Sequence, residues 1–168
     1  MFLELRLSPK VINVDNKLCR GSAPINPRSL LKMKEQGINQ VIDLRNSACL
    51  LSFMEKLFCK ILGLNYVNFK YPHRLDYVPP HDFFQKINEK ITKNEGKTYI
   101  HCHYGKRRTG ICVAIYEKEH TKKTKKDILK ELIELGFKEV LSSGKSKKQV
   151  KLQKIYNDFL KKYFDVQN

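Results

Sequence analysis

The sequence lacks paired cysteines. It has five, an odd count, none spaced as Cys-x-x-Cys: Cys19, Cys49, Cys59, Cys102 and Cys112. This spacing argues against both a disulfide framework and a zinc ribbon. Free thiols are typical of a reducing compartment, so we expect a cytoplasmic location.

Long apolar runs without charge are also missing. The most apolar stretch, residues 48–64, is interrupted by three charged side chains and so cannot cross a bilayer as a helix. Residues 1–14 contain Glu4 and Arg6 and no small-residue cleavage site, which argues against a signal peptide. We therefore expect a soluble intracellular protein with no transmembrane segment.

Acidic residues are scarce relative to basic ones. The chain carries 33 Lys and Arg against 17 Asp and Glu, a formal net charge of +16. Such a charge favours anionic partners, namely phosphorylated ligands, nucleic acid or anionic membranes. The lysines of residues 122–126 and 147–154 have the pattern of solvated helix faces, and no nucleic-acid-binding motif accompanies them. We expect a general attraction for anions rather than a dedicated nucleic-acid surface.

The length and patterning indicate one α/β domain. The chain has 168 residues, 41% hydrophobic and 30% charged, with no low-complexity tract or linker. Residues 1–168 therefore form a single domain with a core of ordinary size. Segments of strand and helix character alternate, which predicts a mostly parallel central sheet of about four to five strands flanked by helices.

The expected elements follow from apolar periodicity and from capping residues. Two short edge strands are expected at residues 11–14 and around Leu18, and further strands at 39–44, 65–70 and 97–101. Expected helices begin after Asn26, at Ser47, at His81, at Thr109 (a central, buried helix), at Thr124 and near Lys147.

A loop of unusual composition lies between the strand 97–101 and the helix that follows. Residues 101–110 read His-Cys-His-Tyr-Gly-Lys-Arg-Arg-Thr-Gly. A tight loop after a strand gathers backbone N–H groups, and the next helix adds the positive end of its dipole. Gly105 and Gly110 suit such a turn. The segment therefore predicts a site for a phosphate dianion.

Three side chains of this loop carry chemistry. The N–H groups and the dipole would stabilise the thiolate of Cys102 and make it a nucleophile at neutral pH. Arg108 offers a planar fork for two phosphoryl oxygens. Thr109 would place a hydroxyl near the sulfur and assist its departure from phosphorus.

The motif Cys-x5-Arg-Thr-Gly, preceded by His and an apolar strand, resembles the phosphate loop of the cysteine-based protein tyrosine phosphatases. The length and flanking pattern are most similar to the dual-specificity branch, including its compact bacterial and viral members. Supporting matches are Arg20–Pro24, Gln40–Arg45, Tyr71–Pro72 and Pro79–Pro80.

The resemblance implies a protein tyrosine phosphatase-like fold and a metal-independent phosphatase without cofactors. It implies that Cys102 is the nucleophile, that Arg108 clamps the phosphate, that Thr109 fills the Ser/Thr position and that His101 supports the loop. Substrate binding falls to the loop itself, at His103, Tyr104, Gly105, Lys106, Arg107 and Arg108.

A general acid is also required. Asp76-Tyr-Val-Pro-Pro80 resembles the Asp-x-x-Pro-Pro acid loop of the family, which assigns this role to Asp76. It lies closer to Cys102 than in many relatives, so Asp82 is the alternative. Asp82 also suits a helix cap, where a carboxylate is favourable.

The substrate class is left open. Phosphotyrosine, with or without phosphoserine and phosphothreonine, is the default for the branch. Lys106 resembles a position of the tensin-type phosphoinositide phosphatases, so inositol phosphates or phosphoinositides are the alternative. Two further alternatives for the function are an RNA 5′-triphosphatase and a phospho-binding pseudoenzyme.

Two further groups of polar residues are more simply interpreted as structural than as functional. His101-Cys102-His103 makes a poor metal site because adjacent strand residues point to opposite faces. Asp43 and Arg45, at the end of a strand, are interpreted as a structural polar pair.

Overall fold

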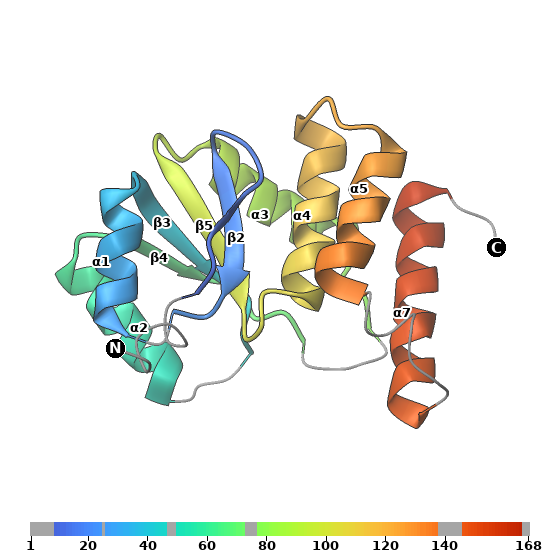
Figure 1. Ribbon diagram of the computed structural model, residues 1–168, viewed down its shortest axis with the longest axis horizontal. Coiled ribbons are helices and arrows are strands. Elements are labelled where there is room, and N and C mark those ends of the chain that lie inside the picture. Colours follow the sequence, from blue (N-terminus) through green and yellow to red (C-terminus); the bar gives the residue numbers. More distant parts are fainter. Residues whose placement is uncertain (1–8, 25, 47–49, 73–76, 138–145, 166–168) are drawn as a thin grey trace.

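A five-stranded sheet forms the centre of the fold (Figure 1). The computed structural model describes residues 9–24, 26–46, 50–72, 77–137 and 146–165. The strands are β1 (Ile12–Asn13), β2 (Leu18–Ser22), β3 (Ile38–Asp43), β4 (Asn65–Asn68) and β5 (Lys97–Cys102). Their order is β1-β2-β5-β3-β4; β1 pairs antiparallel with β2, and the other pairs are parallel. The prediction of a mostly parallel α/β sheet is confirmed.

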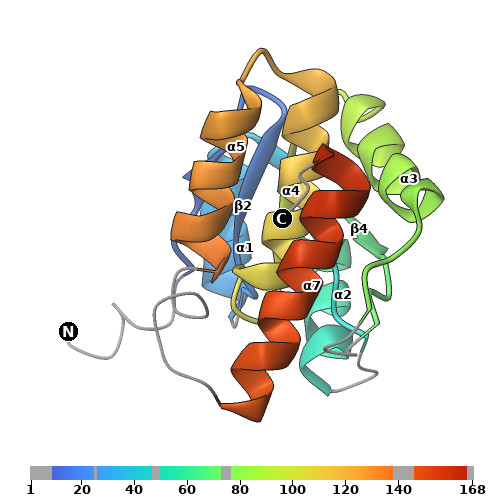
Figure 2. The ribbon, with the colours of Figure 1, turned by 90° about the vertical axis from the view of Figure 1, so that its right-hand side faces the viewer.

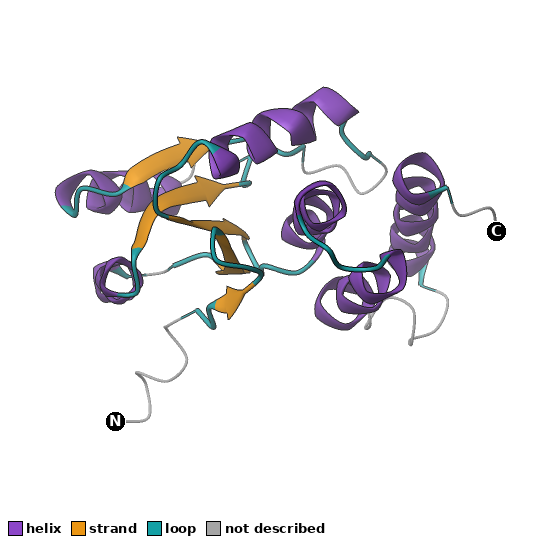
Figure 3. Cartoon of the chain, turned by 90° about the horizontal axis from the view of Figure 1, so that it is seen from above, coloured by secondary structure: helices purple, strands orange, loops and turns teal. Residues whose placement is uncertain are grey.

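Helices cover both faces of this sheet (Figure 3). One face packs against α1 (Pro27–Glu35) and α2 (Leu50–Ile61), the other against α3 (His81–Thr92) and α4 (Arg107–His120). Successive strand residues alternate between the two cores: Cys19, Val41 and Tyr99 lie on the α1–α2 side, and Leu18, Ile42 and Ile100 on the α4 side. This is the two-residue period of a strand buried on both faces.

A further layer lies outside α4. It consists of α5 (Lys125–Leu132), the π-helical turn η2 (Ile133–Phe137) and α7 (Lys147–Phe164). Figure 2 shows α7 in front of α4, between α5 and α3. Since both sides of α4 are covered, residues Thr109–Glu117 are all buried, as expected of a central helix.

Local sequence explains where several helices begin. The Asn26 side chain accepts a hydrogen bond from the Ser29 N–H at 2.8 Å, and Pro27 follows it in the first turn of α1. Ser146 and Gln149 form a reciprocal capping box at the start of α7. Ser47, the expected cap of the next helix, lies outside the described residues, and α2 is described from Leu50.

The expectation of an edge strand around Leu18 is wrong. β2 lies between β1 and β5, whereas β1 and β4 are the two edge strands of the sheet. The short, partly polar sequence of β2 favours an edge strand, but its polar residues contact the loop that follows β5, as described below. Its parallel pairing aligns Ser22 with Cys102, while β3 aligns Asp43 with His101. The carboxyl ends of the three central strands therefore meet at one edge of the sheet.

Candidate active site

The predicted phosphate loop lies at this edge. Cys102 is the last residue of β5, and α4 begins at Arg107. Among the described residues no side chain caps the first turn of α4, and its first intrahelical bond runs from the Gly110 N–H to the Lys106 carbonyl at 2.8 Å. Uncapped N–H groups at a helix N-terminus bind anions. The loop thus has the architecture of a phosphate cradle.

Gly105 is required where the loop turns back against β2. Its φ is +68°, in the left-handed region, and a Cβ there would lie 2.1 Å from the carbonyl oxygen of Gly21. Both the backbone conformation and the space exclude a side chain. The requirement for glycine that the sequence indicated here is therefore steric as well as conformational.

Arg20 supports the loop from behind. This buried β2 side chain donates through Nη2 to the carbonyl oxygens of Gly105, at 2.9 Å, and Lys106, at 3.3 Å. The Ala23 N–H donates to the His103 carbonyl at 3.2 Å. The segment Arg20–Pro24 resembles the family, but its sequence did not predict this role for Arg20. The presence of a charged residue, Arg20, in a short strand is the sequence feature that could have indicated this contact.

The thiol of Cys102 is acidified by its surroundings. Burial alone would raise its pKa, but the Thr109 hydroxyl, the N–H groups of Thr109 and Gly105 and the positive charge of Arg108 bring the pKa below its usual range. Each of these groups stabilises the thiolate.

The other described cysteines behave in the opposite way. Burial raises the pKa of Cys19 and of Cys59 to about 12, and it also raises that of Cys112. All four described cysteines are free thiols, and Cys49 lies outside the described residues. The acidity of Cys102 therefore comes from the loop and not from the fold in general.

Arg108 is fixed between the loop and the end of β3. Its Nη1 donates to the Leu44 carbonyl at 3.1 Å, while the Leu44 N–H donates to the His101 carbonyl at 2.9 Å. Holding one terminal nitrogen orients the plane of the guanidinium. The structure thus brings Arg108 together with Cys102 and Thr109, as the motif predicted.

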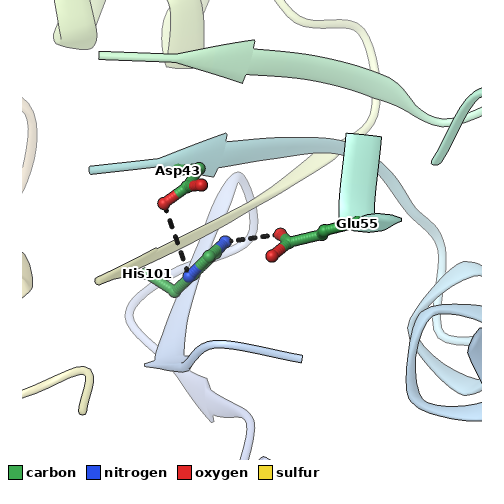
Figure 4. Close-up of side chains that lie close together, drawn as sticks. All are labelled: Asp43, Glu55 and His101. Atoms are coloured by element: carbon green, nitrogen blue, oxygen red, sulfur yellow. Dashed lines mark hydrogen bonds and ion pairs between the residues drawn. The ribbon is translucent and has the colours of Figure 1, made fainter. Parts of the chain in front are cut away.

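His101, which precedes Cys102 in β5, is buried in a network of charges with Asp43 and Glu55 (Figure 4). Its Nε2 lies 2.7 Å from Glu55 Oε1, and its Nδ1 lies 3.1 Å from the Cys102 carbonyl oxygen and 4.0 Å from Asp43 Oδ1. Burial would lower the pKa of His101, but Glu55 and then Asp43 raise it above its ordinary value. The surroundings of His101, the residue before Cys102, therefore favour its protonated form.

Arg45 completes the network. It donates to Asp43 through Nε and Nη2, at 2.8–3.0 Å, and also to Glu55. The Tyr66 hydroxyl donates to Asp43 at 2.7 Å. The predicted Asp43–Arg45 pair is confirmed, whereas the participation of Glu55 was missed because it stands in an apolar run far from His101 in sequence.

The same cluster has the composition of a metal site. Ligand atoms of Asp43, Glu55 and His101 lie within 4.8 Å of one another. However, the Arg45 guanidinium contacts both carboxylates and supplies the compensating positive charge. The donor set is explained as a buried ion-pair network.

The remaining loop side chains face solvent. His103, Tyr104 and Lys106 are exposed, and Arg107 is half-buried. The rings of His103 and Tyr104 meet edge to face, with centroids 4.5 Å apart. These groups are accessible to a ligand in the loop.

The predicted general acid, Asp76, lies outside the described residues. Its alternative, Asp82, lies in the first turn of α3, where Lys86 Nζ is 3.7 Å away. The expectation that Asp82 caps this helix is wrong, since Pro80 occupies the N-cap position. Nearby, the Tyr163 hydroxyl donates to the Pro79 carbonyl at 2.7 Å, which ties the end of the predicted acid loop to α7.

Comparisons with known proteins show which solved structures share this fold. No family model and no curated protein matches the chain in sequence. Among solved structures, the chain is similar to the core catalytic domain of the PP-IP phosphatase SIW14 from S. cerevisiae (TM-score 0.65, 17% identity, 91% of this chain and 96% of that one). It is also similar to TpbA from P. aeruginosa (TM-score 0.61, 16% identity, 89% of each chain). A putative DUF442 phosphatase from Shewanella putrefaciens CN-32 has a TM-score of 0.64 at 17% identity, covering 97% of this chain and 96% of that one.

The fold is therefore shared with these phosphatase structures, in agreement with the protein tyrosine phosphatase-like fold that the sequence motif implied. At these identities the likeness concerns the fold. None of the described helices is long and apolar enough to cross a membrane.

Proposed function

We propose that residues 1–168 form a single catalytic domain that hydrolyses phosphomonoesters through a phosphocysteine intermediate, without a metal or cofactor. The primary substrates we propose are phosphoproteins carrying phosphotyrosine, with or without phosphoserine and phosphothreonine. The observation that carries the proposal is the acidified thiol of Cys102, held beside Arg108 at the mouth of an anion-binding loop.

In the first step the Cys102 thiolate attacks phosphorus in line with the ester oxygen. An S–P bond forms, the P–O bond breaks, and the leaving oxygen takes a proton from the carboxyl group of Asp76. Arg108 and the loop N–H groups bind the non-bridging oxygens, where charge accumulates in the transition state.

In the second step water attacks the phosphocysteine. Its proton passes to the Asp76 carboxylate, the S–P bond breaks and inorganic phosphate leaves. The Thr109 hydroxyl stabilises the departing thiolate, which the acidity of Cys102 makes a good leaving group. The His101 imidazolium, held by Glu55, stabilises the same charge from behind.

A second substrate class has its own support. The loop presents exposed His103 and Lys106 beside half-buried Arg107, an arrangement suited to several phosphates on one small molecule. One similar structure is described as a PP-IP phosphatase. Inositol phosphates or phosphoinositides are therefore the alternative substrates. The free cysteines support a reducing, cytoplasmic setting.

Hydrolysis of p-nitrophenyl phosphate in the presence of EDTA tests the mechanism. The wild type should be active, and Cys102→Ser should be inactive while retaining phosphate binding. Cys19→Ser is the matched control, because its thiol donates to the Thr98 carbonyl as a hydroxyl also does. Activity that EDTA abolishes, or that Cys102→Ser retains, contradicts the proposal.

The general acid is tested with aryl phosphates of graded leaving-group pKa. Asp76→Asn should lose more turnover on poor leaving groups than on good ones, whereas the matched control Asp82→Asn should not. An equal loss across the series for Asp76→Asn, or a graded loss for Asp82→Asn, moves the role away from Asp76.

One preparation assayed on several substrates separates the classes. Phosphotyrosine peptides, inositol polyphosphates and triphosphorylated RNA should differ in kcat/KM, with the highest value for phosphotyrosine peptides. The highest value for inositol polyphosphates or RNA would select that alternative. Binding without turnover of any of them would identify a phospho-binding pseudoenzyme.

A further inference from the structure

The outer face of α2 is apolar. Leu50, Phe53, Leu57 and Ile61 are 73%, 63%, 39% and 69% exposed. Their spacing of three and four residues places them in one row along the helix. These four residues are called the α2 stripe below. A contiguous row of large exposed apolar side chains marks an interaction surface.

The inner face of α2 explains why its apolar residues point outward. The buried positions of this helix are Glu55 and Cys59. Glu55 joins α2 to the sheet through its contacts with His101 and Arg45. Glu55 and Cys59 thus define the face of α2 that packs on the sheet, and the α2 stripe is not part of the hydrophobic core of this chain.

Positive charge accompanies the α2 stripe. Lys56 and Lys60 are exposed on the same helix and lie to one side of the stripe. The only acidic residue between positions 50 and 62 is Glu55, which is buried. The surface of α2 is therefore apolar and cationic, with no exposed carboxylate.

We propose that the α2 stripe, with Lys56 and Lys60, docks the protein on an anionic lipid bilayer. A helix with an apolar face bordered by lysines binds in the plane of a membrane interface, and each lysine adds attraction to anionic headgroups. A second copy of the chain is a poorer occupant, because joining two chains of net charge +16 brings like charges together. The proposal goes beyond the proposed phosphatase activity and does not depend on it.

Docking in this way has a consequence for the site. α2 begins six residues after Leu44, whose carbonyl binds Arg108, so the helix starts near the edge of the sheet that carries the phosphate loop. In Figure 1, α2 and the arrowhead of β2 lie toward the same side of the molecule. Attachment through α2 therefore holds the loop close to the bilayer surface.

Vesicle co-sedimentation tests the proposal. The full chain is mixed with phosphatidylcholine vesicles with and without phosphatidylserine, and binding is measured without turnover. We expect binding only with phosphatidylserine. Phe53→Ser combined with Ile61→Ser should weaken it at least tenfold. Lys56→Glu combined with Lys60→Glu should weaken it by roughly 25-fold or more, at about fivefold for each lysine.

Matched controls lie on α7. Val150→Ser removes another exposed apolar side chain, and Lys151→Glu combined with Lys154→Glu makes the same change in net charge. Both should retain much more binding than the α2 variants. Since all substituted side chains are exposed, unchanged urea midpoints should verify folding.

Three outcomes would overturn the proposal. One is binding to anionic vesicles that the α2 variants retain. The second is an equal loss in the α7 charge variant, which would show unspecific attraction. The third is a concentration-dependent dimer in sedimentation velocity that Phe53→Ser with Ile61→Ser abolishes, which would assign the α2 stripe to a second copy. None of these outcomes bears on catalysis, which the EDTA assay tests separately.

Discussion

At the scale of single residues, the Thr109 hydroxyl has an unusual environment in the phosphate loop. It is buried, and its oxygen has no hydrogen-bond partner among the described residues. A buried hydroxyl without a partner costs about 1–3 kcal/mol. Stabilisation of the Cys102 thiolate, which lowers the pKa of that thiol, accounts for it.

Removing this hydroxyl should make Cys102 less acidic. We expect Thr109→Ala to raise the pKa of Cys102, because the thiolate loses a hydroxyl donor worth about 1 kcal/mol, whereas Thr109→Ser should leave the pKa near the wild-type value. The measurement is the rate of Cys102 alkylation by iodoacetamide as a function of pH. Identical profiles for the two variants would show that the hydroxyl does not contact the thiolate.

A comparison of Gly37 with Gly105 distinguishes the effect of backbone strain from that of a steric clash. Gly37 and Gly105 both have positive φ, at +82° and +68°, but a Cβ at Gly37 meets nothing within 4 Å, whereas at Gly105 it would collide with Gly21. Each Gly→Ala change should cost about 1 kcal/mol of backbone strain. Only Gly105→Ala should also abolish phosphate binding, measured by competitive inhibition with inorganic phosphate. Normal inhibition of Gly105→Ala would mean that the loop tolerates displacement from β2.

Residues with local signals were predictable, and those with tertiary roles were not. Cys102, Arg108 and Thr109 lie in one continuous motif, so their proximity follows from the sequence. Arg20 and Glu55 act through partners distant along the chain, at Gly105 and His101. Nothing in the residues adjacent to Glu55 distinguishes a buried acid from an ordinary solvent-exposed one.

At the scale of elements, α2 is unusual because a buried charge, Glu55, joins it to the sheet beside the apolar contacts of Cys59 and Phe58. The folded-state pKa of His101 lies above the ordinary histidine value of about 6.5, so folding favours the protonated form. The resulting stabilisation is complete below a pH of about 6.5 and is lost as the pH rises through the folded-state pKa. Asp43, Arg45 and Glu55 are the charged groups that set this pKa.

Glu55→Gln should therefore destabilise the protein in a pH-dependent way. We expect a loss of about 1.5–3 kcal/mol of unfolding free energy near pH 6, where His101 is charged in the wild type, and a smaller loss near pH 9. Urea unfolding at both pH values provides the measurement. A penalty independent of pH would indicate that His101 is neutral in the folded protein.

Element types followed well from periodicity, but the positions of two elements depended on tertiary contacts. β2 was expected at an edge but lies inside the sheet, to which it contributes Arg20 and Gly21. Both serve the loop, since Arg20 binds its carbonyls and Gly21 leaves room for Gly105. Similarly, the helix expected over residues 124–135 ends as α5 at Leu132 and continues as the π-helical turn η2, where Gly136 approaches the Lys106 carbonyl. π-helical turns are frequent at functional sites.

At the scale of the whole molecule, net charge and the location of the site act together. The chain carries +16, while the phosphate loop offers a short-range binding site at one edge of the sheet. The long-range field increases the rate at which anions arrive, and the loop determines what happens after arrival. The two contributions differ in their response to salt, because the screening length falls from about 10 Å at 0.1 M to about 3 Å at 1 M.

Salt should therefore reduce kcat/KM according to the charge of the substrate. Between low and high sodium chloride, we expect kcat/KM to fall about tenfold or more for an inositol polyphosphate and much less for p-nitrophenyl phosphate, with kcat nearly constant for both. Lys151→Glu combined with Lys154→Glu, on α7, lowers the net charge without altering the phosphate loop and should flatten the salt dependence for the polyphosphate. If salt instead lowers kcat equally for both substrates, ionic strength acts on the bound phosphate at Arg108, and the overall charge of the chain has no part in delivering the substrate.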